Sequence, residues 1–343
     1  MGFYKSILFI NFKSMKNIGV LFSFGLILML FITGCSPVRK LESEVLKPAE
    51  IGLPAHIKRV GLLFIKPSNN FEYIKGSSFQ EKVLQELKYG IADVTKNTPR
   101  FSPENILLLD KTDIPSLRDT DSITWGHVEV ITDSLDLDAL IIMNRFTLKD
   151  SLDAERSYVG AQTEYYFVLE ISAKVNWLIC VPQGKQILDN YTYKEPYVWE
   201  ALAYDKGEAI RQLPDYEEAF LEAAYWTGYD YADRILPVWE ENDRTFYVRG
   251  NKYMRQAAQK AENGNWKEAI RIWKRNLNHY DKELVSRSAF NIAVAMEMLG
   301  EIELAMKWAR RADEIKPKER AREYYETLKE RKEESEKLEQ QLP

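Results

Sequence analysis

Cysteine and histidine are scarce in this chain of 343 residues, which limits the chemistry that it can perform. The cysteines are Cys35 and Cys180, and the histidines are His56, His127 and His279. His127-Val128-Glu129 matches the first half of a zinc deaminase motif, but no cysteine pair follows to complete it. No stretch has the glycine spacing of a phosphate-binding loop. We therefore expect no metal, no cofactor and no enzymatic activity.

An excess of positive charge is also missing, which argues against nucleic acid as a partner. The formal net charge is −5, with 45% hydrophobic and 29% charged residues. Removing residues 1–34 takes away three lysines and no acid, which lowers the net charge to −8. A mildly acidic protein binds nucleic acid poorly. The length and hydrophobic content indicate two compact units.

The amino terminus has the features of a secretory signal. A basic start is followed by an apolar run from Val20 to Ile32 and a small residue, Gly34, just before Cys35. The sequence Ile-Thr-Gly-Cys resembles a bacterial lipobox, in which Cys35 would be diacylated and become the new amino terminus. The alternative is a signal anchor with an incidental cysteine. Met15 alone begins a complete signal, so the true start is either Met1 or Met15.

A mixed α/β unit is predicted over 57–247, after a proline-containing tether over 35–56. Apolar runs at 57–65, 106–109 and 139–146 predict strands, and helical spacing predicts helices between them. Apolar and polar residues alternate over 169–181, and a second strand at 187–193 follows a turn, which together predict a long hairpin. Pro214 starts a predicted helix that ends before Pro237. This element order is similar to that of the anticodon-binding-like domains of envelope lipoproteins.

Small residues recur with a period of 36 in the predicted helical unit, 248–343. Ala257, Gly264 and Ala269 are followed by Ala293, Gly300 and Ala305. Such spacing lets antiparallel helices pack closely and reverse at the glycine. It resembles two tetratricopeptide repeats, followed by a charged capping helix after Pro317. The predicted fold is therefore an α/β (α+β) sandwich followed by an all-α repeat domain.

Two further stretches carry a broader resemblance. They are Gly264-Asn265-Trp266-Lys267-Glu268-Ala269 and Ala289-Phe290-Asn291-Ile292-Ala293. With the segments around Pro237 and Phe246, they look like an uncharacterised family of Bacteroidota envelope lipoproteins with terminal tetratricopeptide repeats. The resemblance implies an architecture and no assigned activity.

Aromatic residues are dense between Tyr191 and Trp273, which suits a sugar-binding surface or a protein interface. The alternative, which we favour, is that these rings join the two units to each other. Tyr197 and Trp199 follow Pro196 in what we expect to be a loop, and are the candidates for ligand stacking. We also expect three aromatic side chains that precede the repeats to pack against the first unit and hold the repeats on it. They are Trp239, Phe246 and Tyr247.

The candidate partner-binding residues lie on the first helices of the repeats. Tetratricopeptide domains that clamp peptide carboxylates use an asparagine at the place of Asn291, and Arg255, Gln259 and Arg287 are expected beside it. A capping or packing role for Asn291 is the alternative. The sequence thus favours a non-catalytic, lipid-anchored interaction scaffold of the envelope, at the outer membrane. Its partners would be the membrane and another envelope protein or peptide, and the alternative function is glycan binding or processing.

Overall fold

The computed structural model describes residues 38–64, 77–111, 114–117 and 123–342. The predicted signal, Cys35 and both candidate start residues lie outside this range. The described residues form two compact units, one mainly Pro48–Val238 and the other containing residues 38–47 and Trp239–Glu339. Within the described ranges, no helix is both long enough and apolar enough to span a membrane. The mixed α/β class is confirmed, with a sheet-rich part followed by a helical part.

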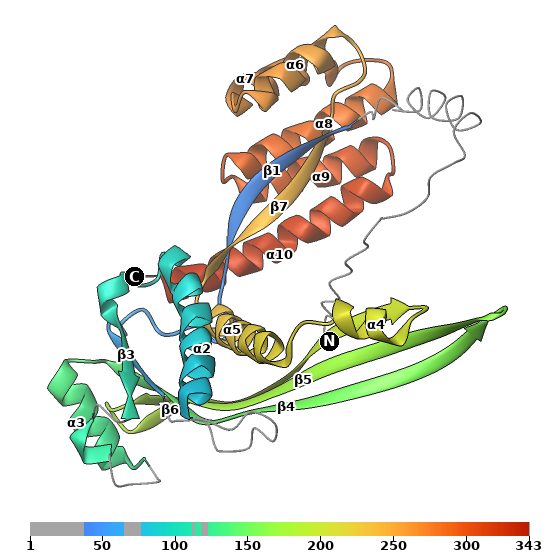
Figure 1. The fold of residues 1–343 in the computed structure, drawn as a ribbon. Helices are drawn as coiled ribbons and strands as arrows, with labels where there is room; N and C mark the ends of the chain where they lie inside the picture. Colours follow the sequence, from blue (N-terminus) through green and yellow to red (C-terminus); the bar gives the residue numbers. More distant parts are fainter. Residues whose placement is uncertain (1–37, 65–76, 112–113, 118–122, 343) are drawn as a thin grey trace. The chain divides into compact units, whose positions relative to one another are not determined.

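The first unit is built on a five-stranded sheet with the order β3-β2-β4-β5-β6 (Figure 1). Its strands are β2 (Val60–Phe64), β3 (Ile106–Asp110), β4 (Ala139–Val159), β5 (Gln162–Val181) and β6 (Gln186–Ala203). β2 is parallel to β3 and β4, whereas β4, β5 and β6 are antiparallel neighbours. All five residues of β2 are buried, as its apolar run predicts for a central strand.

Helices cover both faces of this sheet. They are α2 (Ser77–Asn97), α3 (Trp125–Leu135), α4 (Lys206–Gln212) and α5 (Tyr216–Ile235), and short 3-10 turns occur at Pro103–Asn105 and Pro115–Leu117. α2 and α5 pack on one face with Leu62 and Phe64, and α3 packs on the other with Leu63. Successive residues of a strand point to opposite faces, so a fully apolar β2 serves both layers.

Two glycines allow α2 and α5 to pack in direct backbone contact. A Cβ added at Gly228 would lie 2.0 Å from the Leu87 carbonyl oxygen, and one at Gly90 would lie 1.9 Å from the Tyr225 carbonyl oxygen. No side chain fits in such a gap, so each position needs glycine.

The second unit contains two helix pairs and a long final helix. These are α6 (Lys252–Glu262), α7 (Trp266–Trp273), the 3-10 turn Lys274–Asn276, α8 (Lys282–Met298), α9 (Ile302–Ile315) and α10 (Glu319–Gln341). Gly264 and Gly300 end the first helix of each pair with φ angles of 72° and 79°, a conformation that favours glycine. The repeated alanines Ala257, Ala269, Ala293 and Ala305 are each 0% exposed.

A two-stranded ribbon completes the second unit and corrects two predicted boundaries. β1 (Val38–Lys47) lies in the segment predicted to be a tether, and pairs with β7 (Val238–Tyr247), predicted to be in the α/β unit. Val38 and Leu41 pack against the helical core, together with Phe246 and Tyr247 of β7. Residues 38–47 are therefore part of a folded unit because their apolar side chains are covered by it.

Candidate functional site

The β1–β7 ribbon is held on α8 by a buried asparagine. Asn291 Nδ2 donates to the carbonyl oxygen of Tyr247 at 2.7 Å, and the Tyr247 amide donates to Asn291 Oδ1 at 2.7 Å. Asn291 is 0% exposed. Its amide thus satisfies both backbone groups of one strand residue, as a neighbouring strand would do. This face of α8 therefore binds an extended polypeptide, and here that polypeptide belongs to the same chain.

Aromatic packing anchors the same end of β7. The ring centroids of Tyr247 and Phe290 lie 5.5 Å apart in an edge-to-face arrangement, and those of Phe246 and Trp273 lie 6.2 Å apart. The guanidinium of Arg287 lies 5.1 Å from the centre of the Tyr247 ring. Aromatic pairs of this geometry stabilise by about 0.5 to 1.5 kcal/mol beyond their buried area.

A buried ion pair fixes the middle of β7 to α8 and α10. Arg244 donates from Nε and Nη2 to the two carboxylate oxygens of Glu297, at 2.8 Å each, and Tyr324 Oη donates to Glu297 Oε2 at 2.5 Å. The side chains of Arg244 and Glu297 are 10% and 7% exposed. Burial and the adjacent Glu297 carboxylate raise the pKa of Tyr324 well above its usual value. The tyrosine therefore stays protonated and can donate this bond.

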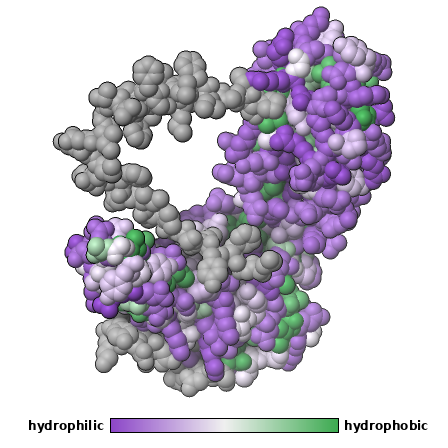
Figure 2. All heavy atoms as spheres, turned by 90° about the vertical axis from the view of Figure 1, so that its right-hand side faces the viewer, coloured by the Kyte–Doolittle hydropathy of each residue, from purple (hydrophilic) through white to green (hydrophobic). Residues whose placement is uncertain are grey.

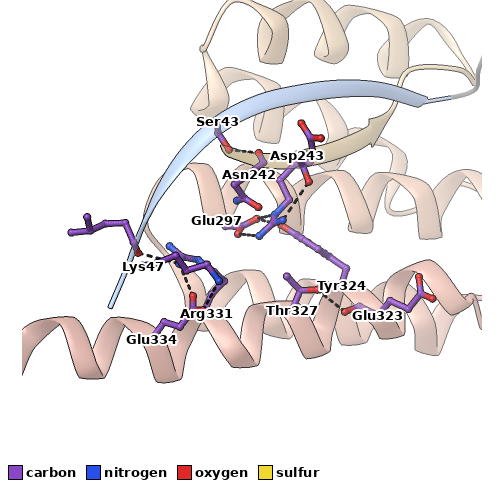
Figure 3. Close-up of polar contacts among 12 residues, drawn as sticks. Ser43, Lys47, Asn242, Asp243, Glu297, Glu323, Tyr324, Thr327, Arg331 and Glu334 are labelled. Carbon is purple, nitrogen blue, oxygen red and sulfur yellow. Dashed lines mark hydrogen bonds and ion pairs between the residues drawn. The ribbon is translucent and has the colours of Figure 1, made fainter. Parts of the chain in front are cut away.

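A cleft of about 130 Å³ lies between the ribbon and α10 (Figure 3). Lys47 Nζ and Arg331 Nη1 both bond the Glu334 carboxylate at 2.6 Å, and Arg331 also donates to the carbonyl oxygen of Leu46 at 3.3 Å. The buried Nδ2 of Asn242 has no hydrogen-bond partner among the described residues. The paired charges of Lys47, Arg331 and Glu334 on one side of the cleft thus fix β1 on α10.

The predicted partner-binding residues do not form one exposed cluster. Asn291 is internal, which contradicts its assignment as a surface contact. Arg255 and Gln259 are exposed on α6. Arg287 is half-buried on α8 and donates from Nε to Glu283 Oε1 at 2.7 Å. Asn291 and Arg287 are thus engaged with the ribbon or with their own helix, because the face that they share with Phe290 packs against β7.

The assignment of Tyr197 and Trp199 to an exposed loop is wrong. Both lie in β6, are half-buried, and pack against the core of the first unit. Tyr193 and Tyr197 share a hydrogen bond of 2.6 Å, and Tyr193 Oη donates to Asp230 of α5 at 2.8 Å. Burial, the main cause, raises the pKa of both tyrosines. These side chains join β6 to α5.

Other aromatic residues of the dense region serve the core of their own unit. Trp177 and Tyr231 stack with ring centroids 3.8 Å apart, and both are 0% exposed. Trp239 is 51% exposed, whereas Phe246 and Tyr247 are buried in the helical unit. Packing inside the core of one unit or the other therefore accounts for most of these rings, whereas the prediction that they join the two units stays a prediction.

Among the described residues, no three His, Cys, Asp or Glu side chains lie close enough together to hold a metal ion. Cys180 is buried, and burial raises the pKa of its thiol to about 11. A thiol with this pKa is protonated at neutral pH and is a poor nucleophile. Cys180 is therefore a small core residue of β5.

The residues that sequence reasoning missed are Arg244, Glu297 and Tyr324. The available signal was an arginine two residues before the apolar pair Phe246 and Tyr247, combined with an acid, Glu297, in the largely apolar second half of α8. A buried acid in an apolar stretch of helix needs a buried cation, and Arg244 supplies it for Glu297.

Two family models match the chain, and each is described as a domain of unknown function. The first, DUF8603, matches residues 85–247, and the second, DUF6340, matches residues 255–330. A comparison with curated proteins found no match.

Two solved structures that match this chain have low TM-scores. A protein described as a neuraminyllactose-binding hemagglutinin homologue from Helicobacter pylori is 10% identical, with a TM-score of 0.32, and the match covers 62% of this chain and 93% of that one. The PelC dodecamer from Paraburkholderia phytofirmans is 8% identical, with a TM-score of 0.23, and the match covers 57% and 98%. TM-scores of this size do not establish a shared fold. The chain is therefore similar to two families without an assigned activity, one over most of its sheet and one over its helices.

Proposed function

We propose that this protein is a non-catalytic, lipid-anchored scaffold of the Gram-negative cell envelope that binds another envelope protein. In this proposal Cys35 carries the lipid, the outer membrane holds the anchor, and the first unit is a domain of the anticodon-binding-like type. The terminal helix pairs are tetratricopeptide repeats, which the 36-residue period and the buried alanines at the helix contacts support.

The observation that carries the proposal is the contact between Asn291 and the backbone of Tyr247. A side-chain amide that pairs with both groups of a strand residue recognises extended polypeptide regardless of its side chains. Because the chain's own ribbon occupies this face of α8, a partner segment must bind elsewhere. In this proposal the partner segment binds at an outer edge of the ribbon.

The ribbon offers such edges because β1 and β7 form a sheet of only two strands among the described residues. Each strand of a two-stranded sheet has one side with unpaired backbone groups, to which an extended partner segment can add. Acidic side chains of the ribbon remain exposed, with Glu42 at 85% and Glu241 also exposed. A partner segment with basic residues fits this edge.

The glycan alternative has less support, because Tyr197 and Trp199 are half-buried side chains of a strand. Stacking on a sugar needs an open aromatic face. The hydroxyl of Tyr197 is already bonded to Tyr193.

Site-specific photocrosslinking in cells tests the scaffold proposal. A crosslinker at Glu42 or at Glu241 should capture the same partner, whereas one at Lys329, exposed on α10, should not. A partner captured equally from all three positions, or from none, would refute binding at the ribbon edge.

Labelled palmitate tests the anchor separately. The label should be incorporated into the unaltered chain and be absent from the Cys35→Ala variant. Equal labelling of both would refute lipidation at Cys35.

A further inference from the structure

A row of basic side chains runs along α7 and the 3-10 turn that follows it. Lys267, Arg271, Lys274 and Arg275 have the spacing i, i+4, i+7 and i+8, which places them on one face, and all four are exposed. Of these four, Arg271 is ion-paired with Glu268, at 2.5 Å, within the described structure. The row therefore has more positive charge than its own helix neutralises.

The excess extends over the whole first helix pair. Residues 249–282 contain nine lysines and arginines and three aspartates and glutamates, within a chain whose net charge is −5. All nine basic side chains are exposed. Lys260 of α6 and Arg275 both lower the pKa of Glu268, although its hydrogen bond with Arg271 is the main cause. Basic residues of both helices thus surround one acid. Figure 2 shows a strongly hydrophilic surface over the helical unit.

The ribbon places the start of the described chain beside this helix pair. Arg39 Nε lies 3.2 Å from Glu262 Oε1 at the end of α6, whereas Lys47, at the other end of β1, is bonded to Glu334 of α10. β1 thus runs along the helical unit, with Arg39 near the end of α6 and Lys47 on α10. Figure 1 shows β1 beside the helices of this unit.

Covalent geometry limits how far Cys35 can lie from that end. Two residues, Ser36 and Pro37, separate Cys35 from Val38, so the two α-carbons are three steps apart, and an extended chain advances at most about 3.6 Å per step. The α-carbon of Cys35 therefore lies within about 11 Å of that of Val38. A lipid on Cys35 holds the α6 end of the helical unit next to the bilayer.

We propose that the basic surface of α6 and α7, centred on Lys267, Arg271, Lys274 and Arg275, rests on the anionic headgroups of the membrane that holds the lipid anchor. This inference rests on the proposed lipidation of Cys35 and names the partner of the anchored end. Lipid chains and a basic surface reinforce each other, because each lowers the cost of keeping the other at the bilayer. The surface adds orientation, since an acyl chain alone leaves the protein free to rotate.

A bilayer fits this surface better than a nucleic acid. The basic row lies at the end of the helical unit that the anchor would bring to the membrane. The rest of the protein is net acidic and would repel a long polyanion. A flat anionic membrane would contact only the basic helix pair, α6 and α7.

Vesicle sedimentation with a chain of residues 36–343 tests the inference without the lipid. This chain keeps every described residue and lacks Cys35. It should bind vesicles of phosphatidylcholine with phosphatidylglycerol and not vesicles of phosphatidylcholine alone, and the binding should weaken as salt increases. Reversal of two charges, Lys267→Glu with Lys274→Glu, should weaken this binding at least about tenfold.

A matched control changes the net charge by the same amount on another helix. Lys329→Glu with Lys337→Glu alters two exposed lysines of α10 and should leave vesicle binding within about twofold of the unaltered chain. Circular dichroism shows whether both variants fold. Equal loss in the two variants, no preference for phosphatidylglycerol, or binding to heparin without binding to vesicles would overturn the inference. Palmitate labelling and crosslinking do not depend on this result, so the failure of either proposal can be recognised separately.

Discussion

Buried polar side chains of the helical unit have specific partners, and Asn291 is the clearest case. A buried asparagine on an apolar helix face would be costly alone, because its amide would lose its hydrogen bonds to water. The backbone of Tyr247 replaces those bonds. The residue that appeared in the sequence as a ligand contact is thus a contact within the fold.

Asn291→Ala should therefore destabilise the protein strongly. The substitution leaves the amide and carbonyl of Tyr247 buried without partners, at about 1 to 3 kcal/mol for each group. We expect the free energy of unfolding in urea to fall by about 2 to 5 kcal/mol. Gln259→Ala, on the exposed side of α6, should change it by less than about 0.5 kcal/mol. Similar values for the two variants would contradict an internal role for Asn291.

Glu283 should make the stability of the helical unit depend on pH in acid. Burial alone would raise the pKa of its carboxyl, but hydrogen bonds from Lys316 and Lys318 outweigh burial and hold the pKa at about 2. A carboxyl with a depressed pKa in the folded state stabilises that state above its unfolded pKa, and this stabilisation disappears as pH falls through the folded pKa. Stability should thus decrease between about pH 5 and pH 2.

The Glu283→Gln variant isolates this effect. It should be less stable than the unaltered chain at pH 7, and the difference should shrink as pH falls towards 2, because the carboxyl then becomes protonated in the folded state as well as in the unfolded state. Thermal unfolding over this pH range measures the difference. A constant difference at every pH would contradict the assignment.

At the scale of the elements, regular periodicity explains which parts could be predicted from the sequence. α2 was predictable because its apolar residues recur at helical spacing, and β5 because alternate residues are apolar over most of its length. β1 was not, because Val38–Lys47 has few apolar residues, and its strand form depends on pairing with β7 and packing on the helices. Pro196 was misinterpreted as a loop signal, although β6 is an edge strand, where proline is tolerated.

The crossing of α2 and α5 provides a test at this scale. Gly228→Ala places a methyl group where only 2.0 Å separates it from the Leu87 carbonyl oxygen, so the helices must move apart. We expect a loss of about 1 to 3 kcal/mol in stability, despite the better helix propensity of alanine. Gly126→Ala, where the nearest atom is 3.8 Å away, should be neutral or slightly stabilising. Equal stability of the two variants would argue against close packing of these helices.

At the scale of the whole molecule, β1 at the start of the described residues and most of α10 near their end belong to the same helical unit. β1 contributes Lys47 to the Glu334 carboxylate and apolar side chains to the helical core. The sequence distance between these contacts is large, so no local pattern could reveal them. The ribbon thus covers a helical surface that the sequence alone predicts to be open. Under the scaffold proposal, a partner would bind at the edge of the ribbon instead.

Removing β1 should consequently weaken the helical unit. A chain that begins at Pro48 loses the ribbon pairing and leaves part of the core around Phe246 uncovered. We expect proteolysis of 239–339 to become faster by at least about tenfold, because the open form is more populated. Addition of a peptide of residues 38–47 should restore part of the resistance. Unchanged proteolysis without β1 would contradict its role in the fold.

The most direct test of this account is hydrogen exchange of residues 38–47 in the chain that starts at residue 36. If β1 belongs to the ribbon, its paired amides should exchange slowly and in parallel with those of β7, and Asn291→Ala should accelerate both strands. Exchange of residues 38–47 at the rate of an unstructured peptide, while β7 stays protected, would show a free tether and contradict the account.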